Sequence, residues 1–168
     1  MSQRPHVLVI FFADLRKEIP QYILEAGISR GKCIAITQPR RIAATSLAAR
    51  VATEQGVSLG ASVGYSIRFD ECCGPSTKIK FITDGMLVRE LVSDKLLSHY
   101  GVIIIDEAHE RTLRTDVLLV NLKRILHRRN GPSLGYDRSE DPLKVVIMSA
   151  TMDAQGFGDF FDGCISSS

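Results

Sequence analysis

The run of four apolar residues from Val102 to Ile105 leads directly into the sequence Asp-Glu-Ala-His at positions 106–109, and this junction constrains the fold more than any other feature of the chain. An unbroken β-branched run lacks the polar alternation of a half-exposed strand, so it predicts a strand covered on both faces. In open α/β sheets, functional residues follow the carboxyl ends of such strands. We therefore expect Asp106 and Glu107 to emerge together into a crevice.

Strand-like apolar runs alternate with amphipathic segments along the chain. The predicted strands are Val7–Phe12, Cys33–Thr37, Ser62–Ile67, Lys78–Ile82, Val102–Ile105 and Lys144–Met148. The predicted helices are Lys17–Ala26, Arg41–Gln55, Gly85–Ser93, Leu113–Arg128 and Asp153–Phe161. This alternation predicts an α/β fold in which helices cover both faces of a mainly parallel sheet.

Composition limits the classes of protein to which the chain can belong. Its 168 residues, 45% of them hydrophobic, suit one domain with a real core. The net charge of +2 gives no global basic field, so nucleic-acid binding would need a local patch. No apolar run approaches membrane-spanning length. The four cysteines form neither a C-x-x-C pair nor a zinc spacing, which indicates free thiols in a reducing, intracellular compartment, either nucleus or cytoplasm.

The two adjacent carboxylates suit nucleotide chemistry. Asp106 can hold a hydrated Mg²⁺ on a nucleotide, and Glu107 can activate a water molecule. The alternative is a strand that ends in acids and a helix cap, with no chemical role. A metal-dependent hydrolase of another kind is less favoured, because no further cluster of His, Asp or Glu completes a metal site.

Polar residues also follow the other predicted strands. Arg40 and Arg41 come after the second strand, where two arginines at a helix start are available for phosphates. Thr83 follows the fourth strand, and Ser149 follows the last. Taken singly, the arginines can instead pair with acids elsewhere, and Thr83 can simply cap a helix. We expect all these strand ends, together with Asp106, to share one edge of the sheet.

In order along the chain, these segments resemble the motifs of the DEAH-box ATP-dependent RNA helicases. TQPRRIAATSLAARVA is similar to motif Ia, TDGMLVREL to motif Ib, DEAHERT to motif II and KVVIMSATMD to motif III, while GYSIRFD resembles the segment between Ia and Ib. The resemblance covers about residues 19–162. It implies that residues 1–162 form the first RecA-like motor domain, of P-loop NTPase type, and that residues 163–168 are a divergent tail.

The resemblance also implies roles for individual residues. Asp106 would hold Mg²⁺ through water, Glu107 would polarise the attacking water, and His109 would be the third member of this catalytic group. The residues that would line the RNA path are Arg40, Arg41, Arg68, Phe69, Thr83 and Gly85. His109, Ser149 and Thr151 would couple the nucleotide state to domain motion, although His109 alone can be a satisfied polar residue. The implied ligands are ATP, Mg²⁺ and RNA, and helicase cofactor proteins are the implied partners.

One departure from the family pattern affects nucleotide binding. Family members carry a glycine-rich loop with Lys and Thr, known as motif I, where this chain has Phe11 to Glu18, a segment with neither Gly nor Thr. Without an amide nest, the phosphates lose three charge-assisted hydrogen bonds of about 1.5–3 kcal/mol each, or about 5–9 kcal/mol. That loss is comparable to a whole micromolar affinity of about 8 kcal/mol. We therefore expect that this chain does not bind ATP with micromolar affinity.

The carboxyl end departs as well, because six unrelated residues follow Asp162. We therefore expect that the second motor domain is missing and that the chain is a truncated gene model or a splice product. Two functional hypotheses remain: a helicase fragment that is inactive as this chain, and a non-catalytic module that binds RNA or protein.

Two further expectations concern the surface. The basic cluster of Lys123, Arg124, Arg128 and Arg129 suits a solvated helix end, where cations interact favourably with the helix dipole. The segment from Asn130 to Pro142, with two Gly and two Pro, is expected to be a mobile surface insertion.

Overall fold

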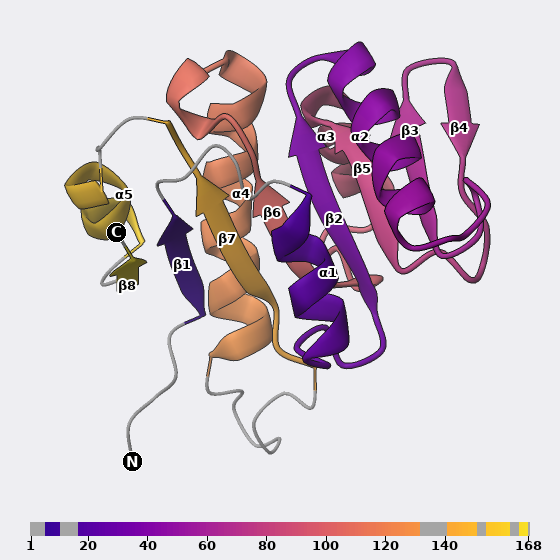
Figure 1. Cartoon of the computed structure of the whole chain (residues 1–168). Helices are drawn as coiled ribbons and strands as arrows, with labels where there is room; N and C mark the ends of the chain where they lie inside the picture. The colour runs from indigo at the N-terminus through magenta and orange to yellow at the C-terminus, as the bar shows by residue number, and fades with distance from the viewer. Residues whose placement is uncertain (1–5, 11–16, 132–140, 151–153, 162–164, 168) are drawn as a thin grey trace.

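A single mixed sheet of eight strands, in the order β4-β3-β5-β2-β6-β7-β1-β8, organises the described chain (Figure 1). The computed structural model describes residues 6–10, 17–131, 141–150, 154–161 and 165–167. The strands are β1 (Val7–Ile10), β2 (Cys33–Gln38), β3 (Val63–Ile67), β4 (Asp70–Cys72), β5 (Ile79–Thr83), β6 (Tyr100–Ile105), β7 (Lys144–Met148) and β8 (Ile165–Ser167). All the pairings are parallel except β3–β4, which confirms the predicted mainly parallel sheet.

Helices cover both faces of this sheet (Figure 1). They are α1 (Glu18–Glu25), α2 (Arg41–Glu54), α3 (Asp84–Ser93), α4 (Leu113–Asn130) and α5 (Ala154–Phe160), with a short 3₁₀ helix, η2 (Ala108–Glu110), between β6 and α4. Core residues of α1 and α2 pack against one face, and those of α3, α4 and α5 pack against the other. None of the helices in the described ranges is long and apolar enough to cross a membrane.

Strand β6 supplies both cores. Ile103 and Ile105 pack with the α3–α4 layer, while Val102 and Ile104 pack with the α1–α2 layer. This division follows from the alternation of side chains along a strand. The whole of β6 is buried, as its unbroken apolar sequence predicts.

Two strands were not predicted from the sequence. Both β4 and β8 have only three residues, and a segment of that length is too short to show a hydrophobic periodicity. Strand β4 turns back on β3 after Phe69, which has a φ of +69°. Strand β8 lies within the segment expected to be a divergent tail, and it pairs with β1. Residues Phe11 and Phe12 of the predicted first strand lie outside the described residues.

The expectation of a wholly solvated basic cluster at the end of α4 is wrong for Arg129. Arg124 and Arg128 are exposed, but the Arg129 side chain is only 5% exposed. Its Nη1 donates to the carbonyl oxygens of Leu97 at 3.1 Å and Tyr100 at 2.9 Å. A basic pattern at a helix end cannot reveal this role, because the acceptors lie about thirty residues earlier in the chain, where it enters β6.

Both ends of the expected surface insertion are held in place. Arg129 Nη2 donates to Asp141 Oδ1 at 2.9 Å. Asn130 donates to the carbonyl oxygen of Leu143 at 2.8 Å and accepts from its N–H at 2.9 Å. Residues 132–140, the middle of this segment, lie outside the described residues, so the expected mobility is not tested there.

Replacing Arg129 with alanine should destabilise the fold strongly. Arg129→Ala leaves buried carbonyl oxygens without a donor, which should lower the free energy of unfolding by roughly 3 kcal/mol. Arg128→Ala, the matched control on the exposed side of the same turn, should change it by less than about 0.5 kcal/mol. Urea denaturation measures both values, and equal losses would contradict the assignment.

Candidate functional site

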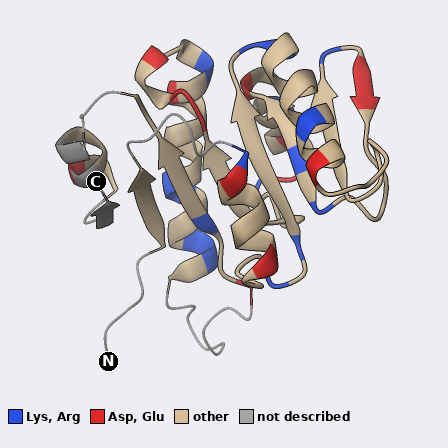
Figure 2. Ribbon diagram, viewed as in Figure 1, with Lys and Arg blue, Asp and Glu red and all other residues tan. Residues whose placement is uncertain are grey.

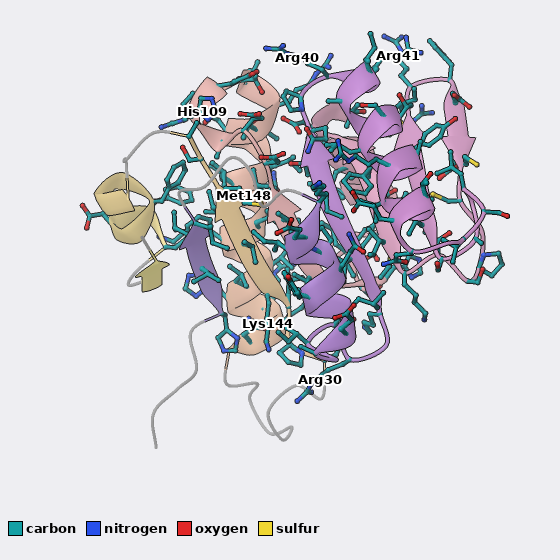
Figure 3. All side chains as sticks on the ribbon, in the orientation of Figure 1. Arg30, Arg40, Arg41, His109, Lys144 and Met148 are labelled. Carbon is teal, nitrogen blue, oxygen red and sulfur yellow. The ribbon has the colours of Figure 1, made fainter. Side chains whose placement is uncertain are left out.

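The carboxyl ends of β2, β5, β6 and β7 lie at one edge of the sheet. The register places Gln38 opposite Thr83, and Ile105 opposite both Thr37 and Ile147. Because the strands are parallel, the residues that follow them emerge at the same edge, as predicted for Asp106 and Ser149. Figure 3 shows Arg40, Arg41 and His109 at this edge. Figure 2 shows lysine and arginine at both edges, with no single basic field.

Asp106 is held rigidly at the end of β6. Its side chain is buried, with the residue only 3% exposed. Oδ1 accepts the Glu107 N–H at 2.8 Å, and Oδ2 accepts the side-chain amide of Gln38 at 2.6 Å. Gln38 is itself fully buried at the end of β2. Sequence reasoning gave Gln38 no role, although a buried amide at a strand end needs a partner.

His109 joins Glu107 to the exit of β7. Its Nε2 lies 3.2 Å from Glu107 Oε2, and its Nδ1 accepts the Ala150 N–H at 3.2 Å. This geometry assigns the proton of a neutral imidazole to Nε2, which donates to the carboxylate. Glu107 has a φ of +54°, a conformation that costs a non-glycine residue about 1–3 kcal/mol. The surrounding bonds hold the backbone in that conformation.

The coupling residues predicted after β7 are placed only in part. Ser149 is buried at this edge, and its N–H donates to the carbonyl oxygen of Ile10 at 3.1 Å. Thr151 lies outside the described residues. The exits of β1, β6 and β7 are therefore connected through Ser149 and through the contact between Ala150 and His109.

The acids suit a cation that arrives with its ligand. Across the described residues, no group of three or more His, Cys, Asp or Glu is placed to hold a metal ion. Mg²⁺ is commonly bound by one or two carboxylates, with waters and substrate phosphates completing its coordination. The fixed carboxylate of Asp106 has oxygen chemistry of this kind, so it fits a nucleotide-borne ion better than a resident one.

The residues predicted to contact RNA lie toward the β3 side of the same edge. Arg40 and Arg41 are exposed where α2 begins. Phe69 is 87% exposed in the β3–β4 turn, and Arg68 Cζ lies 4.8 Å from the centre of its ring. Thr83 is mostly buried, so its side chain offers little surface.

Arg114 is a residue of this surface that sequence reasoning missed. A Cβ added to Gly85 would lie 3.2 Å from Arg114 Nη1, so the guanidinium lies against the first turn of α3. Arg114 is exposed in the first turn of α4. Its sequence position gave no signal, because the contact joins two helices that begin about thirty residues apart.

A buried hydrogen-bonded chain joins the amino ends of α3 and α4. Asp84 Oδ2 accepts the Thr115 hydroxyl at 2.6 Å, and the Thr112 hydroxyl accepts the Thr115 N–H at 3.1 Å. Burial raises the pKa of Asp84, the hydrogen bond from the Thr115 hydroxyl partly offsets that rise, and the charge of Glu110 adds to it. The link places the start of α3 in contact with the segment that follows Glu110.

A hollow of about 590 Å³ lies at the opposite edge, and the titratable groups described there are paired with one another or protonated at neutral pH. Lys80 Nζ there lies 2.9 Å from Glu90 Oε1, and the Tyr100 hydroxyl donates to Glu90 Oε2 at 2.7 Å. The described cysteines are free thiols, as expected, and burial raises the pKa of Cys33 to about 12 and of Cys73 to about 11. Both thiols therefore stay protonated at neutral pH and are poor nucleophiles.

The raised pKa of Asp84 predicts a pH-dependent stability difference. The folded state binds this proton more tightly than the unfolded state, so the contribution of Asp84 to stability falls as pH rises from about 4 through the raised pKa. Asp84→Asn keeps an acceptor for Thr115 and cannot ionise. The variant should therefore gain stability relative to the native chain as pH rises from 4 to 7, measured by urea denaturation. A difference that is constant with pH would contradict the raised pKa.

Comparisons with known proteins agree with this geometry. The chain is 52% identical over 146 residues to a human protein named ATP-dependent RNA helicase DHX33; the match covers 87% of this chain and 20% of that protein. It is 50% identical over 147 residues to human Probable ATP-dependent RNA helicase DHX35, with 86% and 19% covered. The Caenorhabditis elegans homologue of DHX35 is 48% identical over 146 residues, with 86% and 18% covered.

The chain thus spans about a fifth of the length of these relatives. No family model matches it. Identity near 50% over most of the chain nevertheless agrees with the motif order, and the parallel sheet is consistent with a RecA-like helicase domain. The chain is therefore a homologue of one segment of the DEAH-box ATP-dependent RNA helicases.

Proposed function

We propose that this chain is the nucleotide-facing and RNA-facing part of a first motor domain in an ATP-dependent RNA helicase. The observation that carries the proposal is the Gln38–Asp106 hydrogen bond of 2.6 Å, next to the Glu107–His109 pair at the edge where Arg40 and Arg41 emerge. ATP-driven remodelling of RNA is proposed only for a protein that joins this segment to the other parts of such a helicase.

The roles of the acids follow from their fixed positions. Asp106, oriented by Gln38, would hold a nucleotide-borne Mg²⁺ through water, and that ion would neutralise developing phosphate charge. Glu107 would orient the attacking water and accept its proton. His109 donates to Glu107 and accepts from Ala150. A movement of the backbone that follows β7 would therefore change the position of the Glu107 carboxylate through the His109 imidazole.

We further propose that this chain alone does not bind ATP usefully. The sequence from Phe11 to Glu18 contains no glycine for a phosphate nest, and it carries two acids, Asp14 and Glu18, in the stretch that corresponds to the phosphate loop of the family. The same feature supports the second candidate function, a non-catalytic module that binds RNA through the exposed arginines. Micromolar ATP binding by a chain that is given a glycine-rich loop favours the first candidate, and RNA binding without ATP binding even in that chain favours the second.

Calorimetry with ATP and Mg²⁺ should detect no micromolar binding by the purified chain. Replacing Phe11 to Glu18 with a glycine-rich loop that carries Lys and Thr should restore micromolar binding, because the amide nest and lysine return several charge-assisted bonds. Glu107→Gln in the loop-restored chain should leave affinity unchanged, since Glu107 acts on water. Micromolar binding by the native chain would refute the proposal.

The chain should bind single-stranded RNA weakly, with a dissociation constant of roughly 10⁻⁴ to 10⁻⁶ M and little sequence preference. If it contacts two or three phosphates, the slope of log affinity against log salt should be about −1.4 to −2. The double variant Arg40→Ala with Arg41→Ala should reduce both affinity and slope, as fluorescence anisotropy at several salt concentrations would measure.

The matched control is Arg124→Ala with Arg128→Ala, which removes two exposed arginines from the far end of α4. Arg129 is unsuitable as a control because it supports the fold. Equal losses of affinity from the two double variants would place the RNA surface elsewhere.

A further inference from the structure

An ion pair connects the candidate RNA surface to the turn that carries the acids. Arg40 Nη2 lies 3.1 Å from Glu110 Oε1, with side-chain exposures of 76% and 29%. Arg40 precedes α2, and Glu110 is the last residue of η2, the short helix that also contains His109. Figure 3 shows Arg40 and His109 at the same edge of the sheet.

The ion pair of Arg40 with Glu110 competes with the proposed contact of Arg40 with an RNA phosphate. A guanidinium binds phosphate most strongly when its fork of N–H groups faces the oxygens, and the carboxylate of Glu110 occupies part of that fork. A phosphate that takes Arg40 must displace Glu110. It also leaves an uncompensated carboxylate near the bound anion, which weakens binding until salt screens it.

The negative charge of Glu110 also acts on the start of α3. Burial is the main cause of the raised pKa of Asp84, whose carboxylate accepts the Thr115 hydroxyl, and the charge of Glu110 adds to that rise. Glu110 therefore lies between the exposed arginine on one side and the α3–α4 junction on the other. Loss of the ion pair with Arg40 would therefore change the charge balance of the turn from Glu107 to Glu110.

We propose that Glu110 sets the RNA affinity of this surface by holding Arg40 until an RNA phosphate displaces it. The inference rests on the proposed RNA-binding function of Arg40. Displacement releases the β2–α2 turn from η2, so RNA occupancy has a direct physical route to the Glu107–His109 pair. Glu110 is thus a positioning residue, because it acts through Arg40 and does not contact RNA.

A double-mutant cycle tests this role with the chain itself. The probe is a fluorescently labelled oligouridylate, titrated at 50 mM and 200 mM salt, and the affinity is read by anisotropy. Glu110→Gln should tighten binding about threefold at the lower salt, within the 1.4- to 5-fold range expected for an exposed ion pair. The gain should shrink at the higher salt, and it should disappear when Arg40→Ala is also present.

The control is Glu54→Gln. It removes the same charge and breaks the 3.1 Å pair with Arg50, which lies on α2 away from the carboxyl edge, together with the 3.4 Å pair of Glu54 with Lys17. This variant should leave RNA affinity unchanged.

Three results would overturn the proposal. An equal gain from Glu110→Gln with and without Arg40 would mean that Glu110 acts only as a general negative field. No gain, or weaker binding, would mean that the pair does not mask Arg40. RNA binding that survives the Arg40→Ala and Arg41→Ala double variant would show that the proposed RNA surface itself is misplaced, which separates that failure from the first two.

Discussion

The site depends on one constraint, the parallel register of Ile34–Thr37 in β2 against Val102–Ile105 in β6. Because these strands run parallel and side by side, Gln38 ends β2 close to Asp106 at the end of β6, and the amide can bond the carboxylate at 2.6 Å. Burial of β6 between two helical layers fixes that position. A shift of one residue in this pairing would turn every side chain of β6 to the opposite layer and separate Gln38 from Asp106.

Around that bond, the edge divides into a carboxylate side and an arginine side. Asp106, Glu107 and His109 lie at the exits of β6 and β7, while Arg40 and Phe69 lie at the exits of β2 and β3. The link from Asp84 to Thr115 and the pair of Arg40 with Glu110 cross the division. Charge is therefore arranged locally, and the proposed phosphate-binding surface does not require a large net charge on a chain whose net charge is +2.

The sequence predicted the edge but few of its contacts. An unbroken apolar run followed by acids was sufficient to place Asp106, because burial on both faces leaves only the strand end for polar groups. Strands β4 and β8 were not predicted, because a strand of three residues is too short to show a hydrophobic periodicity. The buried role of Arg129 and the contact of Arg114 with Gly85 were missed for another reason: both depend on partners about thirty residues away, which periodicity does not encode.

We infer that the arginine surface (Arg40, Arg41, Arg68 and Phe69) and the acid turn (Glu107–Glu110) are parts of one connected edge. An NMR titration of the ¹⁵N-labelled chain with oligouridylate tests this connection. Backbone amides at Arg41 and Phe69 should shift together with those at Glu110 and Ala150, while Lys78 at the opposite edge should stay unchanged. Shifts confined to the opposite edge, or arginine shifts without any change at Glu110 and Ala150, would contradict it.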